Sequence, residues 1–172
     1  MKEIKGDLFS IDCDAVCITT NGYVKSNGQA VMGKGCAKQA AEYFPDLPKL
    51  LGDRITKNGN VVNLLRHYQG VAILSFPVKP ITRECRNPDE DIVSHMCCNF
   101  TIGQDIPGWA CTASLSLIKT SAEQLVKIVD HNKWETVLIP RVGAGCGELD
   151  WKDIKPVLDE ILDDRFTAVT FK

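Results

Sequence analysis

Short apolar runs rich in valine and isoleucine alternate with stretches of helical periodicity along most of the chain. This order is typical of an α/β sandwich, in which helices cover a central sheet. Residues 14–18 are almost continuously apolar, as expected for a central strand that is covered on both faces. The pattern predicts strands near residues 2–5, 14–20, 61–67, 71–76, 136–140 and 166–171.

Helical periodicity predicts the elements between these strands. In the longest stretch, apolar residues recur at steps of three and four from Leu115 to Val129 and form one buried stripe. The last stretch contains Pro156, which favours a helix capped by Asp153, because the proline then falls in the first turn and costs little. The predicted helices lie near residues 35–44, 47–56, 114–131 and 152–162.

The alternation fails between residues 80 and 112. Prolines and glycines interrupt this stretch, and its apolar residues have poor periodicity. Loops of this length are often functional or mobile. We therefore expect a disordered or lid-like segment here, acting as a lid or in recognition of a macromolecule.

Length and charge narrow the class of protein. The chain has 172 residues, enough for one well-formed core but short for two, so a single domain over residues 1–172 is expected. The formal net charge of −2 argues against a broad basic face for nucleic acid, and leaves a local basic patch open. Residues 1–5 lack an apolar leader segment, and no later run approaches membrane-spanning length. We expect a cytoplasmic monomer without membrane contact.

The chain contains eight cysteines, a smaller fraction than in small disulfide-rich scaffolds, so reduced thiols are favoured. No CxxC pair is present, and the spacings match no zinc module. The favoured interpretation is therefore ordinary thiols, with no metal and no cofactor. The group that raised the metal hypothesis is Cys85, His95, Cys97, Cys98 and Cys111.

Two glycine-bearing segments are candidates for anion binding. They read VMGKGCA at residues 31–37 and PRVGAGCG at residues 140–147, each near the start of a predicted helix. Backbone N–H groups at a helix N-terminus attract phosphate oxygens, and glycine lets the anion approach closely. Two such loops would suit a pyrophosphate, with Cys146 contributing its amide and not its thiol. The alternative is a pair of ordinary turns or connectors.

Four segments resemble, in order, the motifs of macrodomains, which are ADP-ribose-binding α/β/α modules. The segments are residues 6–9, 20–22, 31–37 and 139–145. The resemblance covers about the whole chain except roughly residues 83–112, which look like an insertion. It implies a three-layer α/β/α fold with a central mixed, mostly parallel sheet of about six strands, and ADP-ribose as the ligand.

Within that family, the chain resembles the branch typified by terminal ADP-ribose protein glycohydrolase and by antitoxin macrodomains that remove ADP-ribose from DNA. Residues 31–35 lack the Asn-Ala-Ala-Asn signature of the other branch, and SFPVK at residues 75–79 follows a predicted strand. The resemblance implies that Lys79 is the catalytic residue. Some members carry an aspartate in the second loop, where this chain has Gly147, so the resemblance makes the antitoxin-like members, which also lack it, the closer model.

The resemblance also implies contacts with the ligand. Asp7 would accept a hydrogen bond from the adenine amine, Leu8 would offer its amide to the base, and Asn21 would lie beside the distal ribose. From the residues alone, turn formation is the favoured role of Asp7 and an alternative role of Asn21, and a lysine in the position of Lys79 is usually a solvated residue at a strand end. Arg141 is expected to pair with a carboxylate. The expected ligand-binding residues are Asp7, Leu8, Asn21, Gly33, Lys34, Gly35, Cys36, Gly143, Ala144, Gly145, Cys146 and Gly147.

Three functions are compatible with these residues and motifs. The leading one is a hydrolase that removes ADP-ribose from a modified protein or nucleic acid by cleaving the bond at the anomeric carbon. Lys79 would act as a nucleophile or as a cation that stabilises the leaving group. The alternatives are a binding module without turnover, and a phosphatase acting on ADP-ribose 1″-phosphate, for which no metal set is visible in the sequence.

Overall fold

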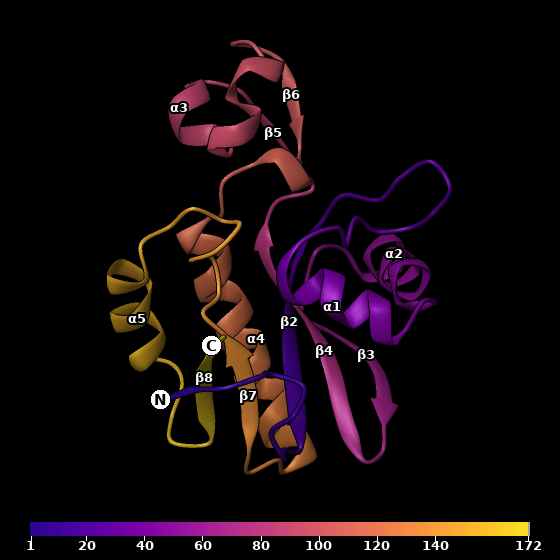
Figure 1. Cartoon of the computed structure of the whole chain (residues 1–172), viewed down its shortest axis with the longest axis vertical. Coiled ribbons are helices and arrows are strands. Elements are labelled where there is room, and N and C mark those ends of the chain that lie inside the picture. Colours follow the sequence, from indigo (N-terminus) through magenta and orange to yellow (C-terminus); the bar gives the residue numbers. More distant parts are fainter. Residues whose placement is uncertain (172) are drawn as a thin grey trace.

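The computed structural model describes residues 1–171. Its main sheet contains six strands in the order β1-β8-β7-β2-β4-β3, and every neighbouring pair is parallel except β3 and β4 (Figure 1). The prediction of a mixed, mostly parallel sheet is confirmed. The strands are β1 (Lys2–Lys5), β2 (Ala15–Asn21), β3 (Asn63–Tyr68), β4 (Val71–Lys79), β7 (Val137–Pro140) and β8 (Phe166–Thr170).

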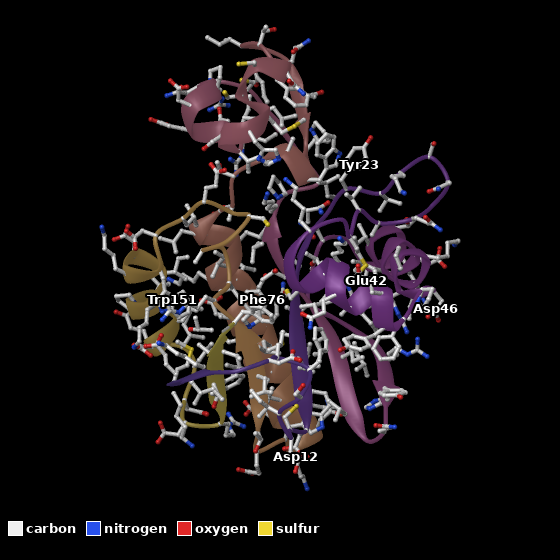
Figure 2. The ribbon with its side chains drawn as sticks, in the orientation of Figure 1. Asp12, Tyr23, Glu42, Asp46, Phe76 and Trp151 are labelled. Atoms are coloured by element: carbon white, nitrogen blue, oxygen red, sulfur yellow. The ribbon has the colours of Figure 1, made fainter. Side chains whose placement is uncertain are left out.

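Helices cover both faces of this sheet, as predicted. One apolar core contains α4 and α5 with the inward residues of the central strands, and Phe76 of β4 is fully buried in it (Figure 2). A second core on the other face contains α1 and α2 together with Ile18 of β2. The three layers therefore follow from two separate apolar faces of one sheet. The helices are α1 (Gly35–Tyr43), α2 (Leu47–Asn58), α4 (Leu115–Asn132) and α5 (Trp151–Asp159).

The predicted start of the last helix is wrong. Helix α5 begins at Trp151, and its N-cap is Asp150, whose carboxylate accepts a hydrogen bond from the Lys152 amide at 3.0 Å. Pro156 therefore lies inside the helix, on its exposed side. The earlier start is favoured because Asp150 caps the free amides and Ile154 and Leu158, one turn apart, both reach the core.

Strand β4 is longer than predicted. It was expected to end at residue 76, but Pro77 and Lys79 still pair with Thr20 and Asn21 of β2. The pairing of β2 with β4 shifts register between Thr20 and Asn21 of β2, and the two strand ends remain paired beyond this irregularity. Lys79 is consequently the last residue of a buried central strand.

Residues 80–112, called the 80–112 module below, are not the irregular segment that the sequence suggested. They form a small folded unit beyond the end of the main sheet (Figure 1). The unit has its own apolar cluster of Cys85, Ile92, Ile106, Ala110 and Cys111. Its elements are β5 (Thr82–Glu84), α3 (Pro88–Asp91), η1 (Ser94–Asn99), β6 (Asp105–Pro107) and η2 (Gly108–Ala110), with β5 antiparallel to β6.

No helix within residues 1–171 is both long and apolar enough to cross a membrane.

Candidate functional site

A pocket of about 1140 Å³ lies at the carboxyl ends of β2, β4, β7 and β8. In α/β sheets the carboxyl ends of the strands are the usual place for ligands, and this volume accommodates a nucleotide-sized molecule. The 80–112 module contributes His95, Met96 and Trp109 to the wall. The pocket therefore has a floor made by the sheet and a wall made by the module.

The first glycine loop reaches this pocket at the start of α1. Gly35 has a φ of +58°, a conformation that favours glycine, and a Cβ added at Gly33 would meet nothing within 4 Å. Lys34 is the N-cap of α1 but supplies no side-chain acceptor, so the first amides of the helix are not capped by a side chain. The groups for which the sequence predicts anion binding are therefore free of a side-chain cap.

Cys36 fixes this loop to the sheet. Its Sγ accepts a hydrogen bond from the Thr19 amide at 3.4 Å and lies 3.2 Å from the Thr19 hydroxyl. Burial raises the pKa of the Cys36 thiol, which stays neutral. Cys36 thus anchors the loop through its side chain and leaves its backbone amide to the pocket.

The second glycine loop, residues 143–147, faces the first across the pocket. A Cβ added at Gly35 would lie 3.9 Å from the Cys146 Sγ. Gly143 has a φ of +77°, and a Cβ at Gly147 would lie 2.5 Å from the Gly143 carbonyl oxygen, so both glycines shape the loop. Gly145 is different, because a Cβ there would meet nothing within 4 Å.

The sequence suggested that the second loop leads directly into a helix, but it does not. It is a series of turns that ends before Asp150 caps α5. Successive turn amides can still form a concave anion site, so the expected amide-rich surface comes from turns and not from a helix dipole.

Lys79 is buried in the pocket wall with 7% of its surface exposed. Its Nζ donates a hydrogen bond to the Trp109 carbonyl oxygen at 3.4 Å, and no carboxylate of residues 1–171 lies within ion-pair distance of it. Burial lowers the pKa of the amine below its usual 10.5, against smaller raising effects of nearby thiols and of Glu148. This environment excludes the solvated lysine that the bare motif allowed.

Asp7 is not part of the pocket wall, although its neighbours Gly6 and Leu8 are. Its carboxylate accepts hydrogen bonds from the Phe9 amide at 3.1 Å and from the Ser10 hydroxyl at 2.8 Å. The Phe9 amide is the main reason that the pKa of Asp7 is lowered. The turn-forming role that the sequence allowed for Asp7 is therefore present.

Asn21 combines a turn role with a place in the pocket wall. Its Oδ1 accepts a hydrogen bond from the Tyr23 amide at 3.0 Å, and its Nδ2 donates to the Val31 carbonyl at 3.0 Å. These bonds tie the end of β2 to the first glycine loop. One N–H of the side-chain amide remains for a ligand.

Several pocket residues could not be singled out from the sequence. Phe171 follows β8 and is 73% exposed beside the end of the pocket that Gly6 and Leu8 line. His95 comes from the 80–112 module, and its Nε2 lies 2.6 Å from the Lys34 Nζ. Phe171 was predicted as the end of the last strand, which ends instead at Thr170, and His95 was considered only for the metal hypothesis.

Arg141 has the structural role expected of it. Its guanidinium lies 3.4 Å from the Glu3 carboxylate and 5.5 Å from the centre of the Trp151 ring. The Trp151 indole N–H also donates to Glu3 at 2.8 Å. These contacts join β1, β7 and α5 at one side of the pocket.

The cysteines and histidine of the metal hypothesis are dispersed. Cys85 and Cys111 are buried in the module's own cluster, whereas Cys97 and Cys98 lie at its surface with their sulfurs 3.8 Å apart. Within residues 1–171, no three or more histidine, cysteine or acidic side chains are arranged to hold a metal ion.

Comparison with known proteins gives a match in structure only. No model of a protein family matches the sequence, and no curated protein matches it. The macrodomain of Mycobacterium tuberculosis DarG is 21% identical with a TM-score of 0.69, and the match covers 99% of this chain and 95% of that one. The macrodomain of Thermus aquaticus DarG is 20% identical with a TM-score of 0.66, over 99% and 97% of the two chains.

A third structure, Thermosipho africanus DarTG in complex with ADP-ribose, is 17% identical with a TM-score of 0.70, over 99% of this chain and 41% of that one. The layers, strand order and pocket define an α/β/α protein with a large pocket at its strand ends. The particular fold is that of the macrodomains.

Proposed function

We propose that this protein binds ADP-ribose in the pocket and hydrolyses ADP-ribose from a modified macromolecule. The observation that carries the proposal is Lys79, a buried amine without a carboxylate partner among residues 1–171, in the wall of a pocket that two amide-rich loops also line. Perturbed titratable groups in a cleft are candidates for chemistry. The ADP-ribose complex of Thermosipho africanus DarTG, which shares the fold, supports the choice of ligand.

The pocket suggests one orientation for the ligand. We place the diphosphate between residues 33–36 and 143–147, where the uncapped amides of α1 and the turn amides converge. The adenine then lies toward Leu8 and Phe171, and the distal ribose toward Asn21 and Lys79. We further propose that the chain is one domain in which residues 83–112 are an insertion.

The chemistry follows from the state of Lys79. A neutral amine can attack the anomeric carbon, so that the bond to the acceptor breaks and the acceptor leaves with the electron pair and gains a proton. Water then replaces the lysine and releases ADP-ribose. A protonated Lys79 would instead stabilise the leaving group as a cation. Burial lowers the pKa of Lys79, which increases the share of neutral amine and so supports the nucleophilic route.

The proposed function is tested by incubating the protein with ADP-ribosylated protein, ADP-ribosylated single-stranded DNA and ADP-ribose 1″-phosphate. Release of ADP-ribose from one of the two macromolecules, with none for Lys79→Ala, is the expected result. Binding of ADP-ribose without any release would identify a non-catalytic module. Release of inorganic phosphate alone would identify a phosphatase.

We also propose that Asp7 contacts the adenine amine in addition to forming its turn. Asp7→Asn should weaken ADP-ribose binding by about tenfold, or about 1.4 kcal/mol, because the amide keeps an oxygen for the Phe9 N–H but loses the charge. Discrimination between adenine and hypoxanthine in the ligand should fall as well. Calorimetric titration with both ligands measures the two effects.

Ser10→Ala is the matched control, since it removes a turn hydrogen bond and leaves the Asp7 carboxylate in place. Parent-like discrimination in Asp7→Asn would restrict Asp7 to the turn.

A further inference from the structure

We propose that the 80–112 module completes the lysine site, with the Trp109 carbonyl, held in place by Gly108, positioning the Lys79 amine. The consequence for turnover rests on the proposed function. The positioning itself depends only on contacts within the protein. It makes the module an internal part of the site and not only a surface for the acceptor.

Lys79 is held at its two ends by different parts of the protein. Its backbone pairs with Asn21 of β2, and its carbonyl oxygen accepts a hydrogen bond from the Asn60 side chain at 3.0 Å. Its Nζ has one hydrogen-bond acceptor among the described residues, the Trp109 carbonyl oxygen at 3.4 Å. The sheet therefore fixes the base of this side chain, and the module fixes its tip.

Gly108 places the Trp109 carbonyl there. The chain leaving β4 and the chain returning from β6 cross in contact, and the Gly108 amide donates to the Ile81 carbonyl at 2.8 Å. A Cβ at Gly108 would lie 1.8 Å from the Pro80 carbonyl oxygen, closer than any side chain can be accommodated without backbone movement. Trp109 follows directly, so its carbonyl position depends on this close crossing.

The module is also attached to the first glycine loop and to Glu148, which directly follows the second. The Glu148 carboxylate accepts hydrogen bonds from the Ser94 amide at 2.9 Å and from the Ser94 hydroxyl at 2.7 Å. Glu148 has a φ of +60°, an unfavourable conformation for a residue with a side chain. The Lys34 Nζ lies 2.6 Å from the His95 Nε2 on the other side. These contacts hold the module over the pocket independently of Gly108.

Two opposing effects act on the Lys79 amine in this arrangement. The Trp109 carbonyl favours the ammonium form, while exclusion of water favours the neutral amine. Exclusion of water is the largest influence, so the pKa of Lys79 is lowered overall. The other groups that act on the amine are Cys146, Cys111, Glu148 and Lys34. Displacing the module should therefore hydrate the amine and raise its pKa.

The test is Gly108→Ala, in which the added methyl group must push the returning chain away from Pro80. Turnover of the macromolecular substrate should fall by about 100-fold, the scale of loss for a misplaced reacting group, while ADP-ribose affinity changes less than about threefold. The activity profile should also shift to higher pH. The extent to which an amine reagent modifies Lys79 can be measured across pH by mass spectrometry of its peptide. The midpoint of this pH dependence should shift toward 10.5.

Two controls separate positioning from general damage. Ile102→Ala and Glu84→Ala each shorten an exposed side chain of the same module and leave the contact between Gly108 and Pro80 unchanged. Both variants should retain the parent's Lys79 labelling profile. If Gly108→Ala does not fold, Ser94→Pro serves instead, because it removes the amide and hydroxyl that bond Glu148 while leaving the Glu148 charge in place, at the first position of η1.

Lys79 labelling that is unchanged in both Gly108→Ala and Ser94→Pro would overturn the proposal. Labelling needs no substrate, so it reports on positioning even if the proposed function fails. Absence of ADP-ribose release by the parent protein, together with the expected shift of Lys79 labelling in Gly108→Ala, would refute the proposed function alone.

Discussion

Replacement of Lys79 by alanine is expected to lower turnover of an ADP-ribosylated macromolecule by about 100-fold or more, while ADP-ribose affinity changes by less than about tenfold. The reason is the position of the amine, which is buried at the end of β4 beside the proposed place of the distal ribose. The alanine removes the reacting group but leaves both glycine loops intact. Single-turnover kinetics and calorimetric titration measure the two quantities separately.

Lys34→Ala is the matched control for loss of a positive charge from the same pocket. Lys34 lies in the first glycine loop, so its loss should weaken binding more than it slows turnover. If Lys79 forms a bond with the sugar through an imine, borohydride added during turnover should leave one ADP-ribose attached at Lys79. An active Lys79→Ala protein would contradict the assignment and direct attention to Asn21, Glu148 or Asp150.

Gly145→Val should reduce ADP-ribose affinity by about 100-fold or more, or about 2.7 kcal/mol, with little loss of stability. Gly145 lines the pocket in the second loop, and the space beside it holds no protein atom within 4 Å of an added Cβ. A valine side chain therefore fits the fold but occupies the volume that we assign to the diphosphate. Calorimetric titration measures the affinity, and thermal unfolding measures the stability.

Gly147→Val, two residues away, should instead reduce the stability of the fold. Its Cβ would lie 2.5 Å from the Gly143 carbonyl oxygen and 2.6 Å from the Ala113 side chain, so the substitution should lower the unfolding temperature. Gly145→Ala should fall between the parent and the valine variant in affinity. Parent-like binding by a folded Gly145→Val protein would move the diphosphate away from this loop.

The main sheet and its helices could be predicted from the sequence because each element is long enough to show a period. The stripe extends over most of α4 from Ile118 to Val129, although Leu115, predicted to begin it, is exposed. Strand β2 begins with an unbroken apolar run at residues 15–18. The 80–112 module could not be predicted in this way, since its elements are three to six residues long. Its core contains Cys85 and Cys111, whose spacing follows no strand or helix repeat.

Those parts of the candidate site could be predicted in which the proposed chemistry requires a particular residue type. The two glycine loops could be located because close approach of an anion requires glycine at particular positions, and the structure brings both loops to one pocket. Trp109 could not be found, because it reaches Lys79 through a backbone carbonyl that every residue possesses. The capping role of Asp150 was missed because Pro156 favoured a later start for α5.

The pairing of β1 with β8 has a consequence for the order in which the protein folds. Lys2 pairs with Thr167, so the first strand cannot enter the sheet until the last strand has been synthesised. Gly6 and Leu8, which follow β1, and Val169 and Phe171, from the end of β8, together line one end of the pocket. Contacts between residues so distant in sequence form late, because the chain must close a long loop to make them. During synthesis on the ribosome, the glycine loops can therefore be in place before this end of the pocket exists.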